Sequence, residues 1–331
     1  MSALDVHPSP AQPAPGEPTP PLPTARAPRG PRSRALLWAG VGLGALAIAQ
    51  VTYQGVDWLS ATTSVSTQVY ASAPVVELIA DGDVTVTGTS TDAVTVERRS
   101  RTGLQETRYT ASEAADLVRV EHTCPRVWSN GVCQAKLAVE LPRGTTVVVR
   151  SAAGAVRAEG VVGDVDLRTW DGGVTVLQAG GSVEARSASG SIDVDGAGGE
   201  VVAITGDGSV TVRAAGGAVT ATSSSGRVLV DGAGGDVSAL TGDGAVEVRT
   251  VTGSAVAKSS AGGVRVGGVT GDVSAISGDG EVVVRGTGTP VALQISTGDG
   301  RSTVEAPTDP AASRTVTIRS SSGDVSYLGA E

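Results

Sequence analysis

The chain has 331 residues, with 46 glycines, no phenylalanine and a formal net charge of −9 at pH 7. Aromatic residues make up only 2% of the sequence, which excludes a large aromatic core; the apolar residues are mainly valine, alanine, leucine and isoleucine. Small and β-branched side chains with abundant glycine favour thin, repetitive β-structure with glycine in the turns. Because the acidic body has no basic stripe, we expect no nucleic-acid partner.

Residues 1–34 are rich in proline and nearly devoid of large apolar side chains. Such a segment cannot bury enough apolar surface to order itself, so we expect a disordered tail. Four arginines lie in this tail, which by the positive-inside rule would keep it in the cytoplasm if the next segment spans a membrane.

An apolar stretch follows, from Ala35 to Tyr53, and its 19 residues would form a helix of about 28 Å, close to the thickness of a bilayer core. Trp38 lies near one end, and Tyr53 and Trp58 lie near the other, as interfacial aromatic residues do. We therefore predict a transmembrane signal-anchor over 35–58, a cell-membrane location and an extracellular body. A cleaved secretory signal is the alternative, because Ala47-Ile48-Ala49 has the small-x-small pattern of a cleavage site.

Residues 59–144 contain the two cysteines, Cys124 and Cys133, on either side of an Asn130-Gly131 turn signal. In an exported protein, two cysteines at this spacing predict a structural disulfide. The region also contains longer apparent strands that do not follow the repeat described next, so we expect it to form a β cap over the open end of a solenoid. His122 is expected to point outward from its strand, beside the disulfide.

From Thr145 the sequence divides into copies of 18 residues, which begin at 145, 163, 181, 199, 217, 235, 253 and 271. The tenth position is always glycine, and positions three, twelve and fourteen are almost always valine. Apolar residues alternate at positions three and five and again at twelve and fourteen, which indicates two short strands per copy. Two weaker copies follow at 291–308 and 314–331. We predict a β-solenoid over 145–331, whose coils bury their apolar faces by stacking.

Charges at position fifteen decide whether one coil takes 18 or 36 residues. With 18 residues per coil, each arginine lies about 4.8 Å from an aspartate on the next strand, whereas with 36 residues arginine would stack on arginine. The sequence therefore predicts 18-residue coils and a structural charge ladder. The charged residues of this ladder are Asp195, Arg213, Asp231, Arg249 and Arg285, with Gly267 before the last of them.

Aspartates also recur at the turns, in every second copy of the central repeats. Aspartate before glycine suits a tight turn, so we interpret these residues as turn formers. A calcium-binding β-roll is the alternative, but it needs aspartates in consecutive nonapeptides, and here the neighbouring copies lack them. The turn aspartates are Asp171, Asp207, Asp243, Asp279 and Asp299.

With these features in hand, the chain resembles the bacterial putative-adhesin family of β-strand-repeat proteins of unknown function. The resemblance covers residues 60–331 and rests on ADGDVTVTG (80–88), VTVERRSR (94–101), the CP…C segment, VELPRGTTVVVRSAAGAVRAEG (139–160) and the GDV…DGxVxV repeats. It implies a β-repeat fold at the cell surface. The family has no established activity or catalytic motif, so the resemblance implies no site residue and no cofactor.

Catalytic patterns are not evident in the sequence. Serine, histidine and aspartate do not form a triad pattern, the glycine-rich turns lack a phosphate-loop motif, and the carboxylates are spread evenly by the repeat. An exported carbohydrate-active β-helix enzyme is therefore a minor alternative. Trp170 lies at a turn, where other copies have alanine, glycine or serine; packing against the cap is the simpler role, and it is also our first candidate for a binding residue.

Taken together, these patterns predict an all-β β-solenoid with two short strands per coil, an N-terminal disulfide-containing β cap and one N-terminal transmembrane helix. We expect a non-enzymatic, adhesin-like protein that presents a rigid interaction surface at the cell envelope, with no cofactor or metal. The alternative is a structural rod that self-associates end to end by strand pairing.

Overall fold

The computed structural model describes residues 31–125 and 132–330, without the side chains of 31–37. Most of the predicted disordered tail and the predicted Asn130-Gly131 turn lie outside the described residues. The chain divides into two compact units, Met1–Thr52 and Tyr53–Glu331, and each is described by itself.

Helix α1 (Pro31–Leu59) contains the apolar stretch, but the predicted transmembrane helix is wrong: no helix in the described part of the chain is long and apolar enough to cross a membrane. The physical reason lies in the length of the apolar run. Among the residues of α1 whose side chains are described, the run extends from Trp38 to Ala49 and is followed by the polar residues Gln50, Thr52, Gln54 and Asp57, so it is shorter than a bilayer core requires.

The part of α1 from Tyr53 onward belongs to the second unit, and Asp57 connects it to the loops of that unit. This carboxylate is only 2% exposed; it accepts hydrogen bonds from the backbone N–H of Leu104 at 2.6 Å and of Val132 at 2.5 Å. The same two bonds, first Leu104 and then Val132, hold the pKa of Asp57 below its ordinary value. The region predicted to lie at a membrane interface is therefore an integral part of the β unit.

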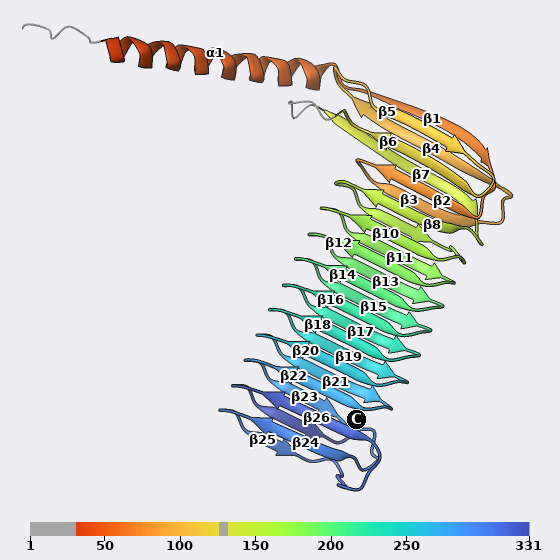
Figure 1. Cartoon of the computed structure of the whole chain (residues 1–331), viewed down its shortest axis with the longest axis vertical. Coiled ribbons are helices and arrows are strands. Elements are labelled where there is room, and N and C mark those ends of the chain that lie inside the picture. The colour runs from red at the N-terminus through yellow and green to blue at the C-terminus, as the bar shows by residue number, and fades with distance from the viewer. Residues whose placement is uncertain (1–30, 126–131, 331) are drawn as a thin grey trace, which may run out of the picture. The chain divides into compact units, whose positions relative to one another are not determined.

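After the end of α1, the second unit is all-β, with 27 strands in the described residues (Figure 1). Those at the N-terminal end are β1 (Thr62–Ala71), β2 (Val75–Ala80), β3 (Val84–Thr89), β4 (Ala93–Thr102), β5 (Arg108–Glu113), β6 (Leu117–Thr123), β7 (Cys133–Pro142), β8 (Thr146–Ser151) and β9 (Val156–Glu159). The repeats form β10 (Val165–Thr169), β11 (Val174–Ala179), β12 (Val183–Ser187), β13 (Ile192–Ala197), β14 (Val201–Thr205), β15 (Val210–Ala215), β16 (Val219–Ser223), β17 (Val228–Ala233), β18 (Val237–Thr241), β19 (Val246–Val251), β20 (Ala255–Ser259), β21 (Val264–Val269), β22 (Val273–Ser277) and β23 (Val282–Arg285). The C-terminal strands are β24 (Ala292–Thr297), β25 (Ser302–Val304), β26 (Thr315–Ser320) and β27 (Val325–Leu328).

Each repeat contributes one strand to each of two long sheets. Sheet A has 14 strands and takes the odd-numbered strands from β9 to β23, while sheet B has 13 strands and takes the even-numbered strands from β8 to β22. Neighbouring strands are parallel and offset by 18 residues: Val174 lies opposite Ile192, and Val183 lies opposite Val201. The 18-residue coil predicted from the charges is therefore the coil that forms (Figure 1).

The core lies between the two sheets and consists of the valine positions of the repeat. Along β15 and β17, for example, Val210, Val212, Val228 and Val230 are all fully buried. Alternate residues of each strand point to this core, as the period-two pattern requires, and alanine at position five of most repeats keeps the two sheets close together. Each coil thus contributes a thin layer, which is covered only when its neighbours are present.

Inside the stack, the hydroxyl groups at position seven of the repeat form a ladder of hydrogen bonds. In most coils the hydroxyl donates a hydrogen bond to the carbonyl of the position-ten glycine in the preceding coil and accepts one from the N–H of the glycine in its own coil; at Thr205 the donated bond to Gly190 O is found. In the middle of the stack, Ser223 Oγ donates to Gly208 O at 2.8 Å and accepts from Gly226 N at 2.8 Å. Both bonds are present at Thr169, Ser187, Ser223, Thr241, Ser259, Ser277 and Ser320.

The invariant glycine at position ten follows from this close approach. A Cβ atom on Gly226 would lie 2.0 Å from the carbonyl oxygen of Gly208, far inside van der Waals contact. Only a residue without a side chain lets the turns of successive coils stack at this distance. The glycine column of the sequence is thus a packing requirement of the turns.

The ends of the stack do not follow the order of the sequence. At the C-terminal end, β26 and β27 stack on β22 and β23, and the earlier strands β24 and β25 lie outside them. At the N-terminal end, β2 and β3 stack on β8 and β9, and the later strands β6 and β7 lie outside them. Antiparallel strands β4, β1 and β5 then complete this end. In the region expected to break the repeat, residues 75–89 therefore form a coil of the stack.

Candidate binding surfaces

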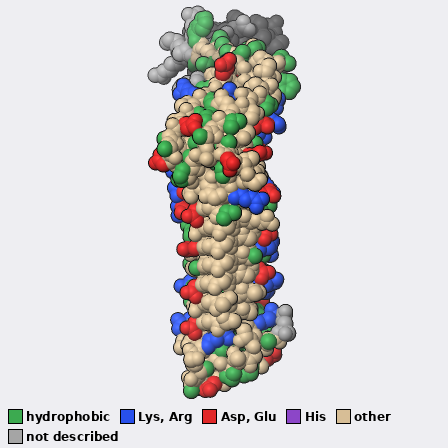
Figure 2. Space-filling view, turned by 90° about the vertical axis from the view of Figure 1, so that its right-hand side faces the viewer, with side chains coloured by type: hydrophobic (Ala, Val, Ile, Leu, Met, Phe, Trp, Pro, Cys, Tyr) green, Lys and Arg blue, Asp and Glu red, His purple; other side chains and the backbone are tan. Residues whose placement is uncertain are grey.

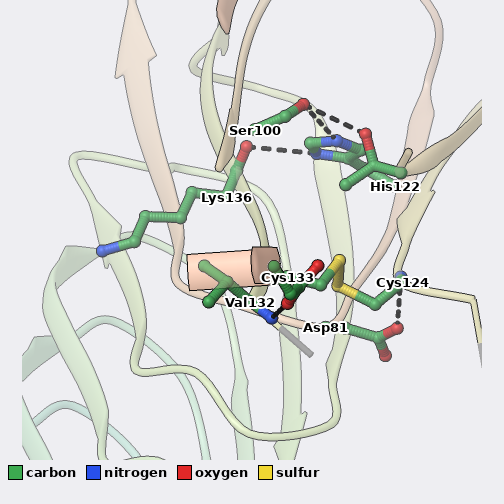
Figure 3. The surroundings of a disulfide bond; sticks show 9 residues. Asp81, Ser100, His122, Cys124, Val132, Cys133 and Lys136 are labelled. Atoms are coloured by element: carbon green, nitrogen blue, oxygen red, sulfur yellow. Dashed lines mark hydrogen bonds between the residues drawn. A yellow bond between two sulfur atoms is a disulfide. The ribbon is translucent and has the colours of Figure 1, made fainter. Parts of the chain in front are cut away.

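The cap is held by a disulfide between Cys124 and Cys133, with Cα atoms 6.0 Å apart, so the predicted disulfide is confirmed. It joins the end of β6 to the start of β7, the two strands of one outer coil. Asp81, from the turn after β2, accepts a hydrogen bond from the Cys124 N–H at 2.7 Å, which ties this coil to the one beneath it (Figure 3). The bridge thus closes the loop 124–133 at the end of the stack.

His122 is fully buried, so the expectation that it points outward is wrong. It follows Val118 and Val120 at the same period-two spacing and therefore shares their inward face. One ring nitrogen lies 3.1 Å from Ser100 Oγ and the other lies 3.3 Å from Lys136 O (Figure 3). Burial is the main cause that lowers the pKa of His122, which favours the neutral ring.

The serine–histidine pair does not have the surroundings of a nucleophile. Ser100 is 7% exposed and His122 is 0% exposed, and a backbone carbonyl orients the ring where a catalytic triad has a carboxylate. Thr107 Oγ1 also donates to Ser100 Oγ, at 3.1 Å. The group is a hydrogen-bonded polar cluster inside the cap, and it satisfies its own buried donors and acceptors.

On the outside of sheet A, the strand register places Asp195 opposite Arg213, Arg213 opposite Asp231 and Asp231 opposite Arg249. The close ion pairs, however, reach position thirteen: Arg213 contacts Asp193 at 3.2 Å, and Arg249 contacts Glu247. An exposed arginine has several acidic neighbours at similar distance, and each such pair contributes at most about 1 kcal/mol. Figure 2 shows charges of both signs along the margins of one face, with mainly backbone and uncharged side chains between them.

All five turn aspartates are exposed at the turns. Several of them connect coils through the backbone; for example, Asp207 N donates to Ala188 O and Asp243 N donates to Ser224 O of the preceding coil. The carboxylates of Asp207 and Asp279 also accept hydrogen bonds from the hydroxyls of Ser225 and Ser322 in the next coil of the stack, at 3.4 and 3.2 Å. Within the described residues, no group of three or more histidine, cysteine, aspartate or glutamate side chains could hold a metal ion.

A different set of aspartates, at position two of the repeat, accepts backbone hydrogen bonds from the next coil. The carboxylates of Asp164 and Asp236 accept the N–H of Ser182 and Ser254 in the next coil, each at 2.8 Å. Sequence reasoning missed these residues and also the hydroxyls of position seven. The signal was present in both cases, because a polar residue that recurs at one position of a solenoid faces its own copies.

Trp170 is 70% exposed, so it does not pack against the cap. It lies at the turn after β10, and its carbonyl accepts hydrogen bonds from Ala188 N and Ser189 N of the next coil. The equivalent residues of the preceding and following coils are Ala152 and Ala188, which have small side chains. The exposed indole ring therefore has only small side chains beside it in the adjacent coils, and backbone hydrogen bonds fix its turn. This arrangement suits stacking against a ligand.

These features define a class: an all-β protein of parallel strands in two long sheets, stacked as a solenoid. No known family profile and no curated protein matches the chain. Among solved structures, similarity is found to a putative cell adhesion protein from Clostridium sporogenes (TM-score 0.28, 9% identity, covering 81% of this chain and 100% of that one). A putative adhesin from Bacteroides fragilis (0.35, 10%, 80% and 97%) and a putative lipid binding protein from Parabacteroides distasonis (0.39, 8%, 81% and 97%) are also similar. At these TM-scores and identities, the similarities establish neither a family nor a function.

Proposed function

We propose that this protein is a non-enzymatic, adhesin-like binding protein of the bacterial cell envelope, whose stacked coils present a rigid surface to a partner. The observation that carries the proposal is Trp170, a large aromatic side chain that is 70% exposed on a turn fixed by backbone hydrogen bonds. A rigid aromatic residue gives contact area at a low cost in conformational entropy, which is why tryptophan is frequent among the residues that dominate binding interfaces.

The disulfide supports a location outside the cytoplasm. Structural disulfides form and persist in oxidising compartments, and in this chain the bridge connects two strands of the cap. The hydroxyl and backbone ladders also support a binding role, because a surface that is already ordered loses less entropy when a partner binds.

The test is co-sedimentation of the full chain with intact bacterial envelopes, with Trp170→Ala compared against Val162→Ala. Val162 is a suitable control because it is the other large apolar residue exposed on the nearby coils, at 55%. We expect saturable binding that Trp170→Ala weakens by about tenfold, corresponding to about 1.4 kcal/mol, and that Val162→Ala leaves unchanged. Absence of saturable binding, or equal binding by both variants, would refute the proposal.

A second candidate function is end-to-end self-association. Strands β24 and β25 are the last strands of sheets B and A, so each has one edge without a partner strand in the described chain, and Val304 on β25 is 46% exposed. Sedimentation velocity of the full chain tests this idea. We expect mass to increase with concentration and Val304→Lys to suppress the increase; a strict monomer at high concentration would exclude self-association.

A further inference from the structure

The charge ladder on sheet A has one gap, at Gly267. Along the strand register, Arg249 lies opposite Gly267, and Gly267 lies opposite Arg285. The alternation of the preceding coils would place an acidic residue at this position. Glycine removes that carboxylate and leaves an opening between two arginines whose strands are about 10 Å apart, twice the spacing of neighbouring strands.

A pocket of about 510 Å³ lies over this gap, on the outside of β19, β21 and β23. Three arginines line it: Arg249, Arg265 and Arg285. Among the described residues that line the pocket, Glu247 is the one carboxylate. The pocket therefore concentrates positive charge on a body whose net charge is negative.

The arginines of the pocket also have interaction partners of their own. Arg249 pairs with Glu247, and Arg265 pairs with Glu281 at 3.4 Å. Each guanidinium has five N–H donors in a planar fork, so one exposed ion pair uses only part of its capacity. The remaining donors suit an acceptor with several oxygen atoms, which can accept bonds from more than one arginine.

The wall of the pocket has two further features. Thr250 has a φ of 54°, and the equivalent residues of the neighbouring coils, Gly232 and Gly268, are left-handed too, so this conformation is a property of the repeat that places a β-branched residue here. Gly286, which also lines the pocket, lies against Tyr327: a Cβ on Gly286 would be 2.8 Å from Tyr327 Oη. Among the described residues, this hydroxyl is the one buried side-chain polar atom without a hydrogen-bond partner.

We propose that this arginine pocket binds a tetrahedral oxyanion, phosphate or sulfate, either free or as the ester group of a larger ligand. The proposal deepens the binding role proposed above by assigning a ligand class to one site, and it rests on that role for its biological purpose. The binding itself can be measured separately, because Trp170 lies 97 residues earlier in the sequence, more than five coils away along the stack.

The decisive variant is Gly267→Asp, which restores the alternating charge. A Cβ at Gly267 would meet only Arg285 Cβ, at 3.7 Å, which is ordinary contact, and the backbone there is not left-handed. The variant should therefore fold, and unchanged thermal unfolding would verify this. We expect isothermal titration of the full chain with sodium sulfate and sodium phosphate, at constant chloride, to show saturable binding that Gly267→Asp weakens by about tenfold or more.

Three more variants separate the effect of charge from the effect of shape. Gly267→Asn adds nearly the same volume without the charge, so binding should be weakened less than by Gly267→Asp. Arg285→Gln should weaken binding, whereas Arg213→Gln, at the same position of the ladder but outside the pocket, should not. No saturable binding by the native chain, or equal affinity for the native chain and Gly267→Asp, would overturn the site.

Glucose 6-phosphate distinguishes the source of the anion. If it binds and depends on Gly267 as inorganic phosphate does, the pocket accepts an ester of a larger ligand; if only the inorganic ions bind, the pocket is a site for free anions. If the native chain binds no anion but still binds envelopes in a way that depends on Trp170, the anion site is refuted and the proposed function stands. If the native chain binds the anion but does not bind envelopes, the anion site stands and the proposed function is refuted.

Discussion

The hydroxyl ladder makes a quantitative prediction for Ser223→Ala. Ser223 is 2% exposed, and its hydroxyl serves two backbone groups at once: it donates to Gly208 O and supplies the acceptor for Gly226 N. Alanine removes both bonds but changes little of the side-chain volume. Leaving a buried polar group unsatisfied costs about 1–3 kcal/mol, so we expect the free energy of local unfolding to fall by about 2–3 kcal/mol.

Hydrogen exchange followed by mass spectrometry is the appropriate assay, because a solenoid can open locally without unfolding as a whole. A loss of about 2–3 kcal/mol corresponds to exchange that is about 30- to 140-fold faster in peptides that contain Gly226 and the turn of the preceding coil. Peptides several coils away should be unaffected, since each coil contacts only its neighbours.

Ser224→Ala is the matched control. Ser224 is the next residue, it is exposed, and no hydrogen bond of its side chain is found in the structure. An exposed substitution of this kind should change stability by less than about 0.5 kcal/mol. Equal exchange rates in the two variants would show that the hydroxyl ladder contributes nothing to the stacking of coils.

Three further predictions concern the turns and the cap. Gly226→Ala should destabilise the full chain in urea unfolding by more than the roughly 1 kcal/mol of an ordinary glycine replacement, because its Cβ would lie 2.0 Å from Gly208 O; a smaller loss would contradict the packing account. Thr250→Gly should stabilise the chain by about 1 kcal/mol in the same assay, because glycine accepts the left-handed conformation freely, and a loss of stability would show that the threonine side chain is needed there. As pH falls below about 6.5, the unfolded chain should bind a proton at His122 that the buried ring resists, so His122 should lower stability by at most about 1.4 kcal/mol per pH unit; an equal acid dependence in His122→Gln would refute this assignment.

The repeat allowed much of the fold to be predicted from the sequence. Valine alternation located the strands, and the charges of position fifteen distinguished 18-residue from 36-residue coils, because stacked copies of a residue must tolerate one another. The partners of the charges could not be predicted in the same way. Arg213 can reach Asp193, Asp195 or Asp231, and flexible exposed side chains choose among such neighbours by small energy differences.

Three further features of the structure differ from the sequence-based prediction or were not predicted: the burial of His122, the helix over 35–53 and the arginine pocket. His122 follows Val118 and Val120 at the spacing of an inward face, so the alternation itself indicated burial. The transmembrane prediction rests on the length of the apolar segment 35–53, and it is wrong because no helix of the described residues is long and apolar enough to cross a membrane. The arginine pocket was not predicted, because the order of residues in the ladder does not show which side chains surround Gly267.

The exchanged order of the terminal coils bears on how the protein is made. Residues 291–304 leave the ribosome before 315–328, yet the later segment ends up directly against residues 273–285. The emerging chain can first place residues 291–304 on that vacant edge, since both segments match it in pattern. Wherever this happens, residues 291–304 have to withdraw and dock again one layer further out, so the native order of this end forms only once residues 315–328 are available.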